Sequence, residues 1–567
     1  GFAIFAFGSL GLVYLVGSDF FPAVDSGQIR LHARAPAGTR IESTEMIFAN
    51  IENEIRSVIA PHELDTILDN IGLPNSSFNL AFGDCPSIGV SDGEILISLK
   101  EDHTPTEIYT ERLRKRLHER FPDVTVFFEA ANITNQILNF GLPSPIDVQV
   151  TGREAGPNYK IAQQLAEKIA RIPGAADVHI HQVVDAPELR INVDRTKAGQ
   201  LGLTQQNVAN SLLISLAGSG QVAPNQWLNW GNGVNYQVMV QTPQYKIDSV
   251  DALMRTPISG GNLSMVSNTS GSMAGTSGAS DASMGAAPNQ ASAAYGNPGS
   301  IPGSTQLLSN LATIDHGVAT EIVNHYNVQP VYDVFANVDR RDLGSVTSAV
   351  EKIMNQTHVP KSTTLMLRGQ SRTMQTSFYR LGLGVIAAII LVYLLMAVNF
   401  QSWMDPLIIV SALPGALAGI LWMLFVTQTT FSVPSLMGAI MCIGVATANS
   451  ILMLVFANDE RMDGKGVRAA ALSAGFTRLR PVLMTAAAMI LGMLPMSLGL
   501  GEGGEQNAPL GRAVIGGLLL ATVTTLFIVP IVYTYLRKSP PVDHDKEIEE
   551  EERELIPGAE SWHDLSR

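Results

Sequence analysis

One amide side chain lies in the middle of an apolar stretch, where it could take part in chemistry. Asn449 is the only charged or amide residue of the stretch 436–457. Such a group at bilayer depth costs about 3 kcal/mol or more unless it is paired or faces a cavity. It therefore marks either a functional contact or an interhelical hydrogen bond that only fixes packing. Gly444, Ala446 and Ser450 around it are small enough to let a neighbouring helix approach closely.

The next apolar stretch is preceded by two arginines and carries a hydroxyl group. Arg478 and Arg480 come before the stretch 481–500, and Thr485 lies inside it. Arginines at the end of a membrane helix are typical anchors on the cytoplasmic side. A threonine inside a helix commonly bonds to a carbonyl group of its own helix. A role in transport therefore has a structural alternative at each of these positions.

Six apolar stretches must position these side chains. They cover residues 2–17, 381–398, 406–426, 436–457, 481–500 and 513–536. A run of about 17 to 25 apolar residues matches a hydrocarbon core of about 30 Å, so we expect six membrane spans, of which the first is a little short. Residue 1 is Gly and the apolar run follows at once, without the basic segment of a signal peptide. We therefore expect a fragment that begins inside a membrane helix.

Basic residues set the expected orientation in the membrane. Arg461, Lys465 and Arg468 lie between the fourth and fifth spans, and further basic residues follow the last span. Lys and Arg accumulate on the cytoplasmic side, so the segment 19–377 is expected on the opposite face. The predicted location is the inner membrane of a Gram-negative cell, with several spans and a large periplasmic domain.

The polar segment after the first span alternates between strand-like and helix-like patterns. A first unit is expected to contain strand 28–34, helix 41–59, strands 62–71 and 94–100, helix 105–120 and strand 124–130. A second is expected to contain strand 145–151, helix 158–171, strands 175–181 and 330–338, helix 343–355 and strand 363–367. This order predicts ferredoxin-like split βαβ units. The predicted fold class is a membrane α-helical bundle of six spans joined to an α+β periplasmic domain.

About 145 residues interrupt the second unit, too many for a loop in a compact domain, so residues 185–329 are predicted to form an inserted subdomain. Within it, the segment 259–305 consists almost entirely of Gly, Ser, Ala, Asn, Met and Pro. Such a segment cannot bury enough apolar surface to order itself, so a disordered loop is expected, with a partner-binding arm as the alternative. The other predicted domains are 1–18, 19–144, 145–184 with 330–374, 375–538 and an acidic tail, 539–567.

Composition excludes several classes of function. The 567-residue chain has a formal net charge of −14, whereas nucleic-acid binding needs clustered Lys and Arg, so no nucleic-acid partner is expected. Its two cysteines, Cys85 and Cys442, lie far apart and provide neither a disulfide framework nor a metal site. The sequence has no nucleophile elbow, phosphate loop or zinc-ligand spacing. We therefore predict no enzymatic activity and no catalytic residue, and expect an ion gradient as the energy source.

Several strings resemble those of the resistance-nodulation-division (RND) efflux permeases, specifically the C-terminal half of the hydrophobe/amphiphile exporters. The strings are 21–27 (FPAVDSG), 35–38 (APAG), 400–406 (FQSWMDP), 444–452 (GVATANSIL) and 478–485 (RLRPVLMT). Each string alone is a weak signal, but they follow one another in this order on the predicted topology. The resemblance covers the chain apart from the low-complexity segment and the acidic tail.

The resemblance implies a proton-driven antiporter that exports amphiphilic small molecules. It also implies a homotrimer, with an N-terminal half of the same permease, a periplasmic adaptor protein and an outer-membrane channel as partners. It implies no cofactor, and the energy source that it implies is the proton gradient. The two βαβ units would be porter subdomains, and the insertion 185–329 would be a docking or funnel subdomain.

Two alternatives to this function remain. A heavy-metal exporter is one, although no cluster of Met, His or Cys indicates a metal relay. An RND-like protein-export or lipid-shuttling protein is the other, and the docking-sized insertion favours efflux over it.

The resemblance also assigns roles to individual residues of the membrane part. Arg478 matches an arginine of the proton relay and Thr485 matches a relay threonine. Ala448 stands where the best-studied members have a Lys. We therefore expect Asn449, Arg478 and Thr485 to supply the polar contacts of the relay.

Substrate clefts are implied near the loop 72–93 and near the strand 124–130. Phe78, Phe82, Phe127 and Phe128 lie there and are the predicted substrate-binding residues. Aromatic side chains offer a large apolar area without demanding hydrogen bonds, which suits amphiphilic molecules. Ordinary core packing is the alternative for each of them.

Overall fold

A computed structural model describes residues 1–73, 87–139, 141–220, 222, 225–260, 305–500 and 503–537. The chain divides into two compact units, Asp185–Ala319 and the remainder, Gly1–Val184 with Thr320–Arg567. Each unit is described by itself. Phe78 and Phe82, most of the segment 259–305 and the acidic tail lie outside the described residues.

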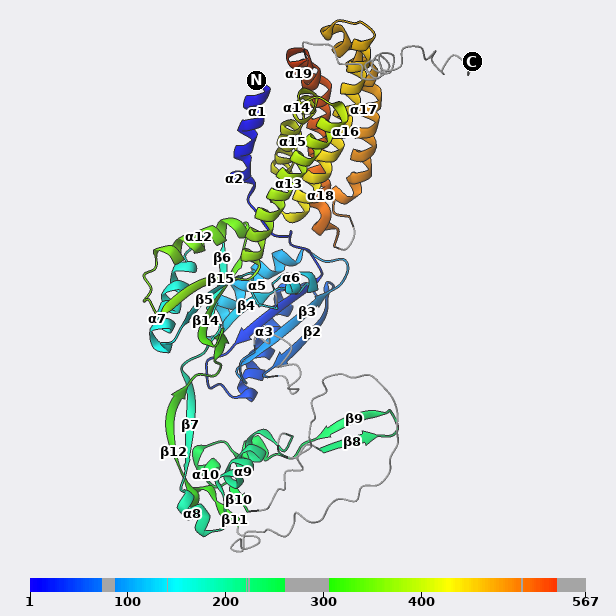
Figure 1. Ribbon diagram of the computed structural model, residues 1–567. Coiled ribbons are helices and arrows are strands. Elements are labelled where there is room, and N and C mark those ends of the chain that lie inside the picture. Colours follow the sequence, from blue (N-terminus) through cyan, green and yellow to red (C-terminus); the bar gives the residue numbers. More distant parts are fainter. Residues whose placement is uncertain are drawn as a thin grey trace, which may run out of the picture. The chain divides into compact units, whose positions relative to one another are not determined.

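Among the described residues, five helices are long and apolar enough to cross a membrane (Figure 1). They are α13 (Gln370–Phe400), Met404–Val426 with its segments α14 (Met404–Val410) and α15 (Leu413–Val426), α16 (Val433–Met462), α17 (Val467–Ser497), and Gly504–Leu536. The last contains α18 (Gly504–Val523), a π-helical turn (Thr524–Ile528) and α19 (Val529–Leu536). The expected first span corresponds to a shorter apolar helix, Phe2–Val16.

The predicted start of the fifth apolar span does not coincide with the start of a helix. α17 begins at Val467, and Pro481 lies inside it. Arg478 and Arg480 interrupt the apolar pattern, but their side chains leave the backbone hydrogen bonds of the helix intact. The apolar run therefore marks only the part of the helix that is suited to the bilayer, and the helix extends beyond that part.

Glycines bring two of these helices into close contact. A Cβ atom added to Gly419 of α15 would lie 2.3 Å from the carbonyl oxygen of Gly516 of α18. A Cβ atom added to Gly516 would lie 2.1 Å from the Cβ atom of Met423. Small residues at such contacts let membrane helices pack closely. α13 and α17, in contrast, are largely exposed along their apolar lengths.

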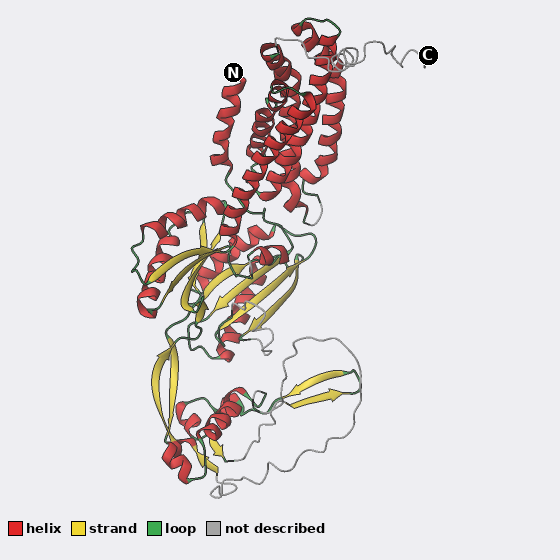
Figure 2. Cartoon of the chain, viewed as in Figure 1, coloured by secondary structure: helices red, strands yellow, loops and turns green. Residues whose placement is uncertain are grey.

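The first sheet has the strand order β2-β3-β1-β4 and is antiparallel. Figure 2 draws the strands in yellow. Its strands are β1 (Gln28–Arg34), β2 (Leu64–Ile71), β3 (Asp92–Leu99) and β4 (Thr125–Glu129). The helices α3 (Ile41–Val58) and α5 (Thr106–Arg120) follow β1 and β3 along the chain. Leu31 of β1 packs with Phe48 of α3 and Leu113 of α5 in a buried core. These predicted elements are confirmed, with ends shifted by one or two residues.

The second sheet has the order β13-β14-β5-β15, and β6 also pairs with β14. Its strands are β5 (Ile146–Gly152), β6 (Ala175–Ile180), β13 (Asn324–Tyr326), β14 (Gln329–Val338) and β15 (Thr363–Arg368). The helices are α7 (Ala155–Ile169) and α12 (Leu343–Gln356). Its buried core includes Val148, Leu165 and Val346. β6 and β14 are neighbours although the whole second unit separates them in sequence.

The unit Asp185–Ala319 is built from short elements around a small core. Its long strands β7 (Ala186–Val193) and β12 (Ala312–Ala319) pair with each other. Its helices are α8 (Arg195–Gln200), α9 (Gln205–Ala217), α10 (Val250–Met254) and α11 (Leu308–Leu311). Two further strand pairs are β8 (Asn225–Asn229) with β9 (Val234–Val238), and β10 (Pro257–Ser259) with β11 (Thr305–Leu307). Val208, Leu253 and Leu308 are buried together in the core.

Candidate functional sites

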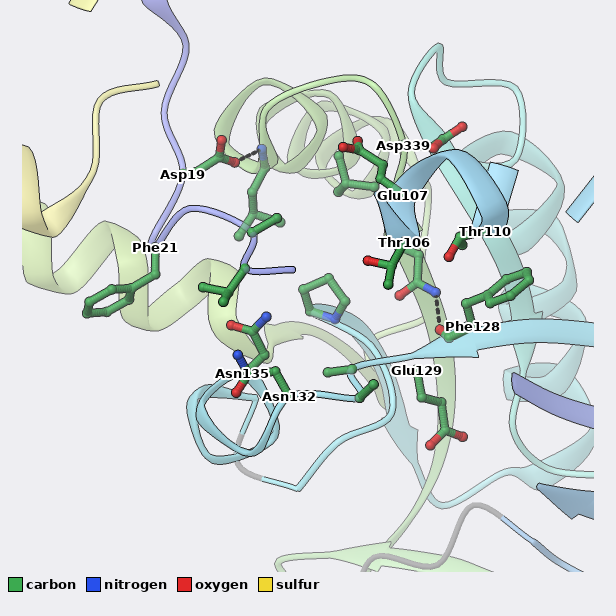
Figure 3. Close-up of a pocket in the computed structure, with 18 of the residues that line it drawn as sticks. Asp19, Phe21, Thr106, Glu107, Thr110, Phe128, Glu129, Asn132, Asn135 and Asp339 are labelled. Atoms are coloured by element: carbon green, nitrogen blue, oxygen red, sulfur yellow. Dashed lines mark hydrogen bonds between the residues drawn. The ribbon is translucent and has the colours of Figure 1, made fainter. Parts of the chain in front are cut away.

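A cavity of about 700 Å³ lies where the two sheets meet the ends of the membrane helices (Figure 3). β4 and the short helix α6 (Ile133–Leu138) form part of its wall, together with α5 and the segment that follows β14. Gln370, the first residue of α13, and Gln428 and Thr430, between α15 and α16, line it from the membrane side. A molecule in this cavity would contact both the soluble and the membrane part of the unit.

The lining of the cavity combines aromatic with charged and amide side chains. Phe21 and Phe128 are among its lining residues, together with Glu107, Asn132 and Asn135 (Figure 3). Aromatic rings supply apolar contact area, and a few polar groups orient a ligand by hydrogen bonds. The arrangement suits a molecule with an apolar body and a polar group.

Two neighbouring phenylalanines of β4 have different surroundings. Phe128 lines the cavity, and the guanidinium carbon of Arg114 lies 5.1 Å from the centre of its ring. Phe127 is fully buried, with ring-centre distances of 4.4 Å to His32 and 3.9 Å to His179. Successive strand residues point to opposite faces, and the Phe128 ring is buried in the core of the first sheet and its helices, at the edge of the cavity. Substrate binding by Phe127 stays a prediction, and in this structure Phe127 is a packing residue.

Phe127 lies in a buried polar cluster between the two sheets. The members of this cluster are Arg30, His32, Arg34, Asp92, Glu94 and Glu129 from the first sheet, and His179 and His181 from the second. His32 pairs with Asp92, and Arg34 Nε lies 3.1 Å from the same carboxylate. Arg34 Nη1 also donates a hydrogen bond of 3.0 Å to the carbonyl oxygen of His181. These contacts join the two sheets.

Three residues of the cluster have the geometry of a possible metal site. Ligand atoms of His32, Glu94 and Glu129 all lie within 4.8 Å of one another. Arg30 contacts both carboxylates, with its Nε 3.0 Å from Glu129, so a bound cation would have to displace this guanidinium group. Burial raises the pKa of Glu129 to about 8, and the charge of Arg30 opposes that shift. The residues could hold a divalent cation only after their ion pairs rearrange.

The two histidines of the second sheet are held in the neutral form. Burial lowers the pKa of His179 and that of His181 to about 3. Nε2 of His179 and Nδ1 of His181 are buried, and no described residue gives either atom a hydrogen bond. A His in an unfolded chain binds a proton below about pH 6.5, whereas these two stay neutral in the folded state. They therefore destabilise the folded chain as the pH falls from about 6.5 toward 3.

Replacing His179 by Phe is expected to make the protein less sensitive to acid. In the wild type, His179 binds up to one proton more in the unfolded state than in the folded state. The variant removes this difference, which changes the free energy of unfolding by about 1.4 kcal/mol per pH unit below pH 6.5. Thermal unfolding of the purified protein between pH 7.5 and 5.0 measures the effect. The melting temperature of the variant should fall less steeply than that of the wild type.

His103 provides a control of opposite sign. Burial lowers the pKa of this residue, but the hydrogen bond to Asp25, the hydrogen bonds to backbone groups and the charge of Asp25 together outweigh that effect, so the net pKa is raised. His103 therefore stabilises the folded state below pH 6.5, and this contribution is lost as the pH rises through its folded pKa. His103→Gln should make the acid loss of stability steeper. Parallel curves for wild type and His179→Phe would show that His179 is not buried in the neutral form.

The predicted relay residues lie on two adjacent membrane helices. Asn449 of α16 is buried, and the Thr485 hydroxyl of α17 lies 3.5 Å from its side-chain oxygen. The same hydroxyl donates a hydrogen bond of 3.0 Å to the carbonyl oxygen of Val482, in its own helix. Both the interhelical and the intrahelical role expected from the sequence are thus present. The structure brings Asn449 and Thr485 together.

Arg478 faces the same neighbour two helical turns before Thr485. Its guanidinium carbon lies 5.2 Å from the ring centre of Phe456 on α16, and its Nε is buried without a hydrogen-bond partner among the described residues. Phe456 follows Asn449 by seven residues, just as Thr485 follows Arg478, so the two contacts lie about 10 Å apart along antiparallel helices. Arg480, in contrast, is exposed. One face of this helix pair therefore carries all three predicted relay residues.

Ala448 is exposed on the surface of the described bundle, next to the buried Asn449. Further polar contacts of the bundle went unnoticed in the sequence. The hydroxyls of Ser450 and Thr525 lie 3.2 Å apart, and Thr525 belongs to the π-helical turn. Arg537 lies 3.5 Å from Asp405. Hydroxyl groups are common in membrane helices, and the sequence pattern does not indicate which of them form hydrogen bonds with each other.

The sequence model of the AcrB/AcrD/AcrF family matches residues 1–290 and 300–537. The chain belongs to this family of RND permeases. The match confirms the resemblance expected from the short strings. The solved structure of a heavy-metal efflux pump, in its crystal form I, is similar with a TM-score of 0.73 and 22% identity over 95% of this chain. At this identity the likeness shows an RND transporter fold alone.

Two characterised relatives differ in the substrates that their names state. The chain is 26% identical over 525 residues to the cobalt-zinc-cadmium resistance protein CzcA of Cupriavidus metallidurans, covering 91% of this chain and 45% of CzcA. It is 27% identical over 543 residues to the multidrug resistance protein MdtC of Yersinia enterocolitica, covering 92% of this chain and 45% of MdtC. The chain thus spans about half the length of these relatives.

Proposed function

We propose that the chain is the C-terminal half of a proton-driven RND efflux permease that exports amphiphilic molecules. The observation that carries this proposal is the cavity next to the ends of the membrane helices. Phe21, Phe128 and several charged and amide residues line it. An amphiphilic molecule partitions to the surface of a bilayer, and the cavity offers it both apolar area and polar partners there. Phe78 and Phe82, which lie outside the described residues, stay predicted substrate-binding residues.

In this proposal, the roles of the parts of the chain and its partner proteins are those that the family implies. Phe2–Val16 would be part of a sixth span, and both sheets would be periplasmic porter subdomains of ferredoxin-like type. The recurrence of the order β2-β3-β1-β4 as β6-β14-β5-β15 supports that assignment. Asp185–Ala319 would dock onto an adaptor protein and an outer-membrane channel. A homotrimer, with an N-terminal half for each subunit, would complete the pump in the inner membrane.

Proton coupling would use the helix pair α16 and α17. Asn449, Thr485 and Arg478 share one face of this pair. Ala448 has an exposed side chain, so it could face the other half of the permease without supplying a cation. Acidic residues of that half would then bind and release protons beside Arg478, which would supply the positive charge that a Lys at position 448 would otherwise supply.

A divalent metal cation is the second candidate substrate. Two observations favour it: the grouping of His32, Glu94 and Glu129, and the similarity to CzcA. Imidazole and carboxylate ligands suit zinc and related divalent ions. The ion pairs with Arg30 oppose it, because a bound cation would have to displace the guanidinium group that contacts both carboxylates. We therefore rank it second.

Replacing Phe128 by Ala tests the proposed substrate. We expect the dissociation constant for rhodamine 6G, an amphiphilic cation, to rise about tenfold or more, because a buried aromatic contact stabilises by about 1.5–3 kcal/mol. Fluorescence anisotropy with the purified protein measures it. Phe476→Ala is the control, since Phe476 is 77% exposed on α17 and does not line the cavity.

Equal affinities of the wild type and Phe128→Ala would contradict the cavity as the substrate site. Calorimetric titration with Zn²⁺ decides between the two candidates. If rhodamine 6G does not bind, and Zn²⁺ binds to the wild type but not to His32→Phe, the metal cation replaces the amphiphile as the substrate.

A further inference from the structure

Asp177 has an unusual backbone for a residue in a β-strand. Its φ is +53°, in the left-handed region that side chains other than glycine seldom adopt. The register between β6 and β14 shifts at this point, so β6 carries one residue more than its partner, as in a β-bulge. Bulges redirect a side chain away from the regular alternation of the strand. Strain of this kind persists only where other contacts stabilise it.

The contacts of the Asp177 carboxylate supply that stabilisation. Arg114 of α5 donates to both of its oxygens, with distances of 2.8 and 3.0 Å. The backbone N–H of Phe128 donates at 3.3 Å and the side-chain amide of Asn337 at 2.9 Å. The Asp177 side chain is only 3% exposed. A two-point pair between a guanidinium and a carboxylate is among the strongest and most directional hydrogen-bonding arrangements.

These partners come from different parts of the unit. Arg114 and Phe128 belong to the first sheet and its helix, whereas Asp177 and Asn337 belong to the second sheet. Asn337 also donates to the carbonyl oxygen of Phe128. The carboxylate is therefore the centre of a joint between the two sheets. Nearby, Arg340 pairs with Glu111 of α5 across the same joint.

The same partners form a wall of the cavity. Arg114, Phe128 and Asn337 all line it, whereas Asp177 lies behind them and does not. We propose that Asp177 is a positioning residue that couples the cavity to the joint, so that the width of the cavity and the closure of the two sheets change together. The proposal rests on the proposed function only in taking the cavity as the substrate site. It adds the residue through which substrate affinity is tuned.

Two substitutions separate the carboxylate from the backbone. Asp177→Asn keeps the shape and one acceptor oxygen but loses the negative charge that Arg114 contacts at two points, and among the described residues the only ion pair that Arg114 keeps is that with Asp339. Asp177→Gly relieves the positive φ and removes every side-chain contact. If the residue served the backbone alone, the Gly variant would bind substrate as well as the wild type. We expect both variants to raise the dissociation constant for rhodamine 6G about tenfold, because they leave a largely buried donor unsatisfied.

A cysteine pair reports the joint independently of substrate. Glu111→Cys and Arg340→Cys replace two side chains that contact each other across the joint and are 42% and 70% exposed. With both native cysteines replaced, a short bifunctional thiol reagent should cross-link this pair efficiently in the otherwise unchanged protein. Asp177→Asn or Asp177→Gly in the same background should lose most of the cross-linked product. Asp123→Asn, an exposed acid on the loop before β4, is the control and should leave it unchanged.

The two readouts distinguish the failure of each idea. Wild-type affinity in Asp177→Gly, or full cross-linking in both variants, would overturn the positioning role. If rhodamine 6G binds to neither the wild type nor any variant, the proposed substrate fails. In that case the cross-linking alone decides the coupling of the sheets through Asp177.

Discussion

Arg478→Ala will abolish proton-linked export in the permease that contains this chain, whereas Arg480→Ala will retain it. The difference follows from their surroundings. Arg478 contacts Phe456 of the neighbouring helix, and its buried Nε has no hydrogen-bond partner in the part of the chain that the structure describes, whereas Arg480 is exposed. A buried guanidinium nitrogen that lacks a hydrogen-bond partner among the described residues could serve an acid of the other half in the proposed permease. Loss of a group that supports proton transfer lowers a rate by about 100-fold or more.

Reconstituted vesicles with an imposed pH gradient measure this effect. Uptake of rhodamine 6G and proton flux are followed together for the wild type and both variants, at equal amounts of inserted protein. Arg478→Lys is a further control, because it keeps the positive charge but not the planar group. Full uptake and proton flux in Arg478→Ala would contradict the relay role, and Arg478 would then be an anchor at the membrane surface.

Gly516→Ala is expected to destabilise the membrane bundle strongly. The added Cβ atom would lie 2.1 Å from the Cβ atom of Met423 and 2.6 Å from the carbonyl oxygen of Gly419. Real Cβ atoms do not approach other atoms so closely, so α15 and α18 would have to separate. Overpacking of this kind costs about 3 kcal/mol, which corresponds to a fall in melting temperature of about 5 °C or more. Thermal unfolding in detergent measures the fall.

Gly444→Ala on α16 is the matched control. Apart from the nearby backbone of α16 itself, no atom of the described residues lies within 4 Å of a Cβ atom added there. Alanine also has the higher helix propensity, so this variant should be as stable as the wild type or slightly more stable. An equal loss of stability in both variants would mean that packing of α15 against α18 does not limit the stability of the bundle.

The sequence predicted the regular elements of the soluble part well. β1 was expected over residues 28–34 and has these bounds. Alternation of apolar and polar residues reports which face of a strand is buried, and this property is local. The same alternation places Arg30, His32 and Arg34 on the polar face of β1. It does not indicate which residues of the second sheet contact that face. Contacts between two sheets depend on tertiary structure that no local pattern encodes.

The candidate sites were predicted only in part. Asn449 and Thr485 were expected to act together, and their side chains are 3.5 Å apart. Phe127 and Phe128 were treated alike, although one lies in the polar cluster and the other lines the cavity. Asp177 was not noticed, because a bulge depends on the pairing register of two strands that are far apart in sequence.

Coupling of export to protons is the central claim of this account, and one measurement tests it most directly. The complete permease in proteoliposomes, without ATP, is given a pH gradient, and rhodamine 6G transport is recorded before and after an ionophore collapses the gradient. We predict transport that begins with the gradient, stops on its collapse and is accompanied by proton flux in the opposite direction. Transport that continues at the same rate after the collapse, or that moves no protons, would contradict the account.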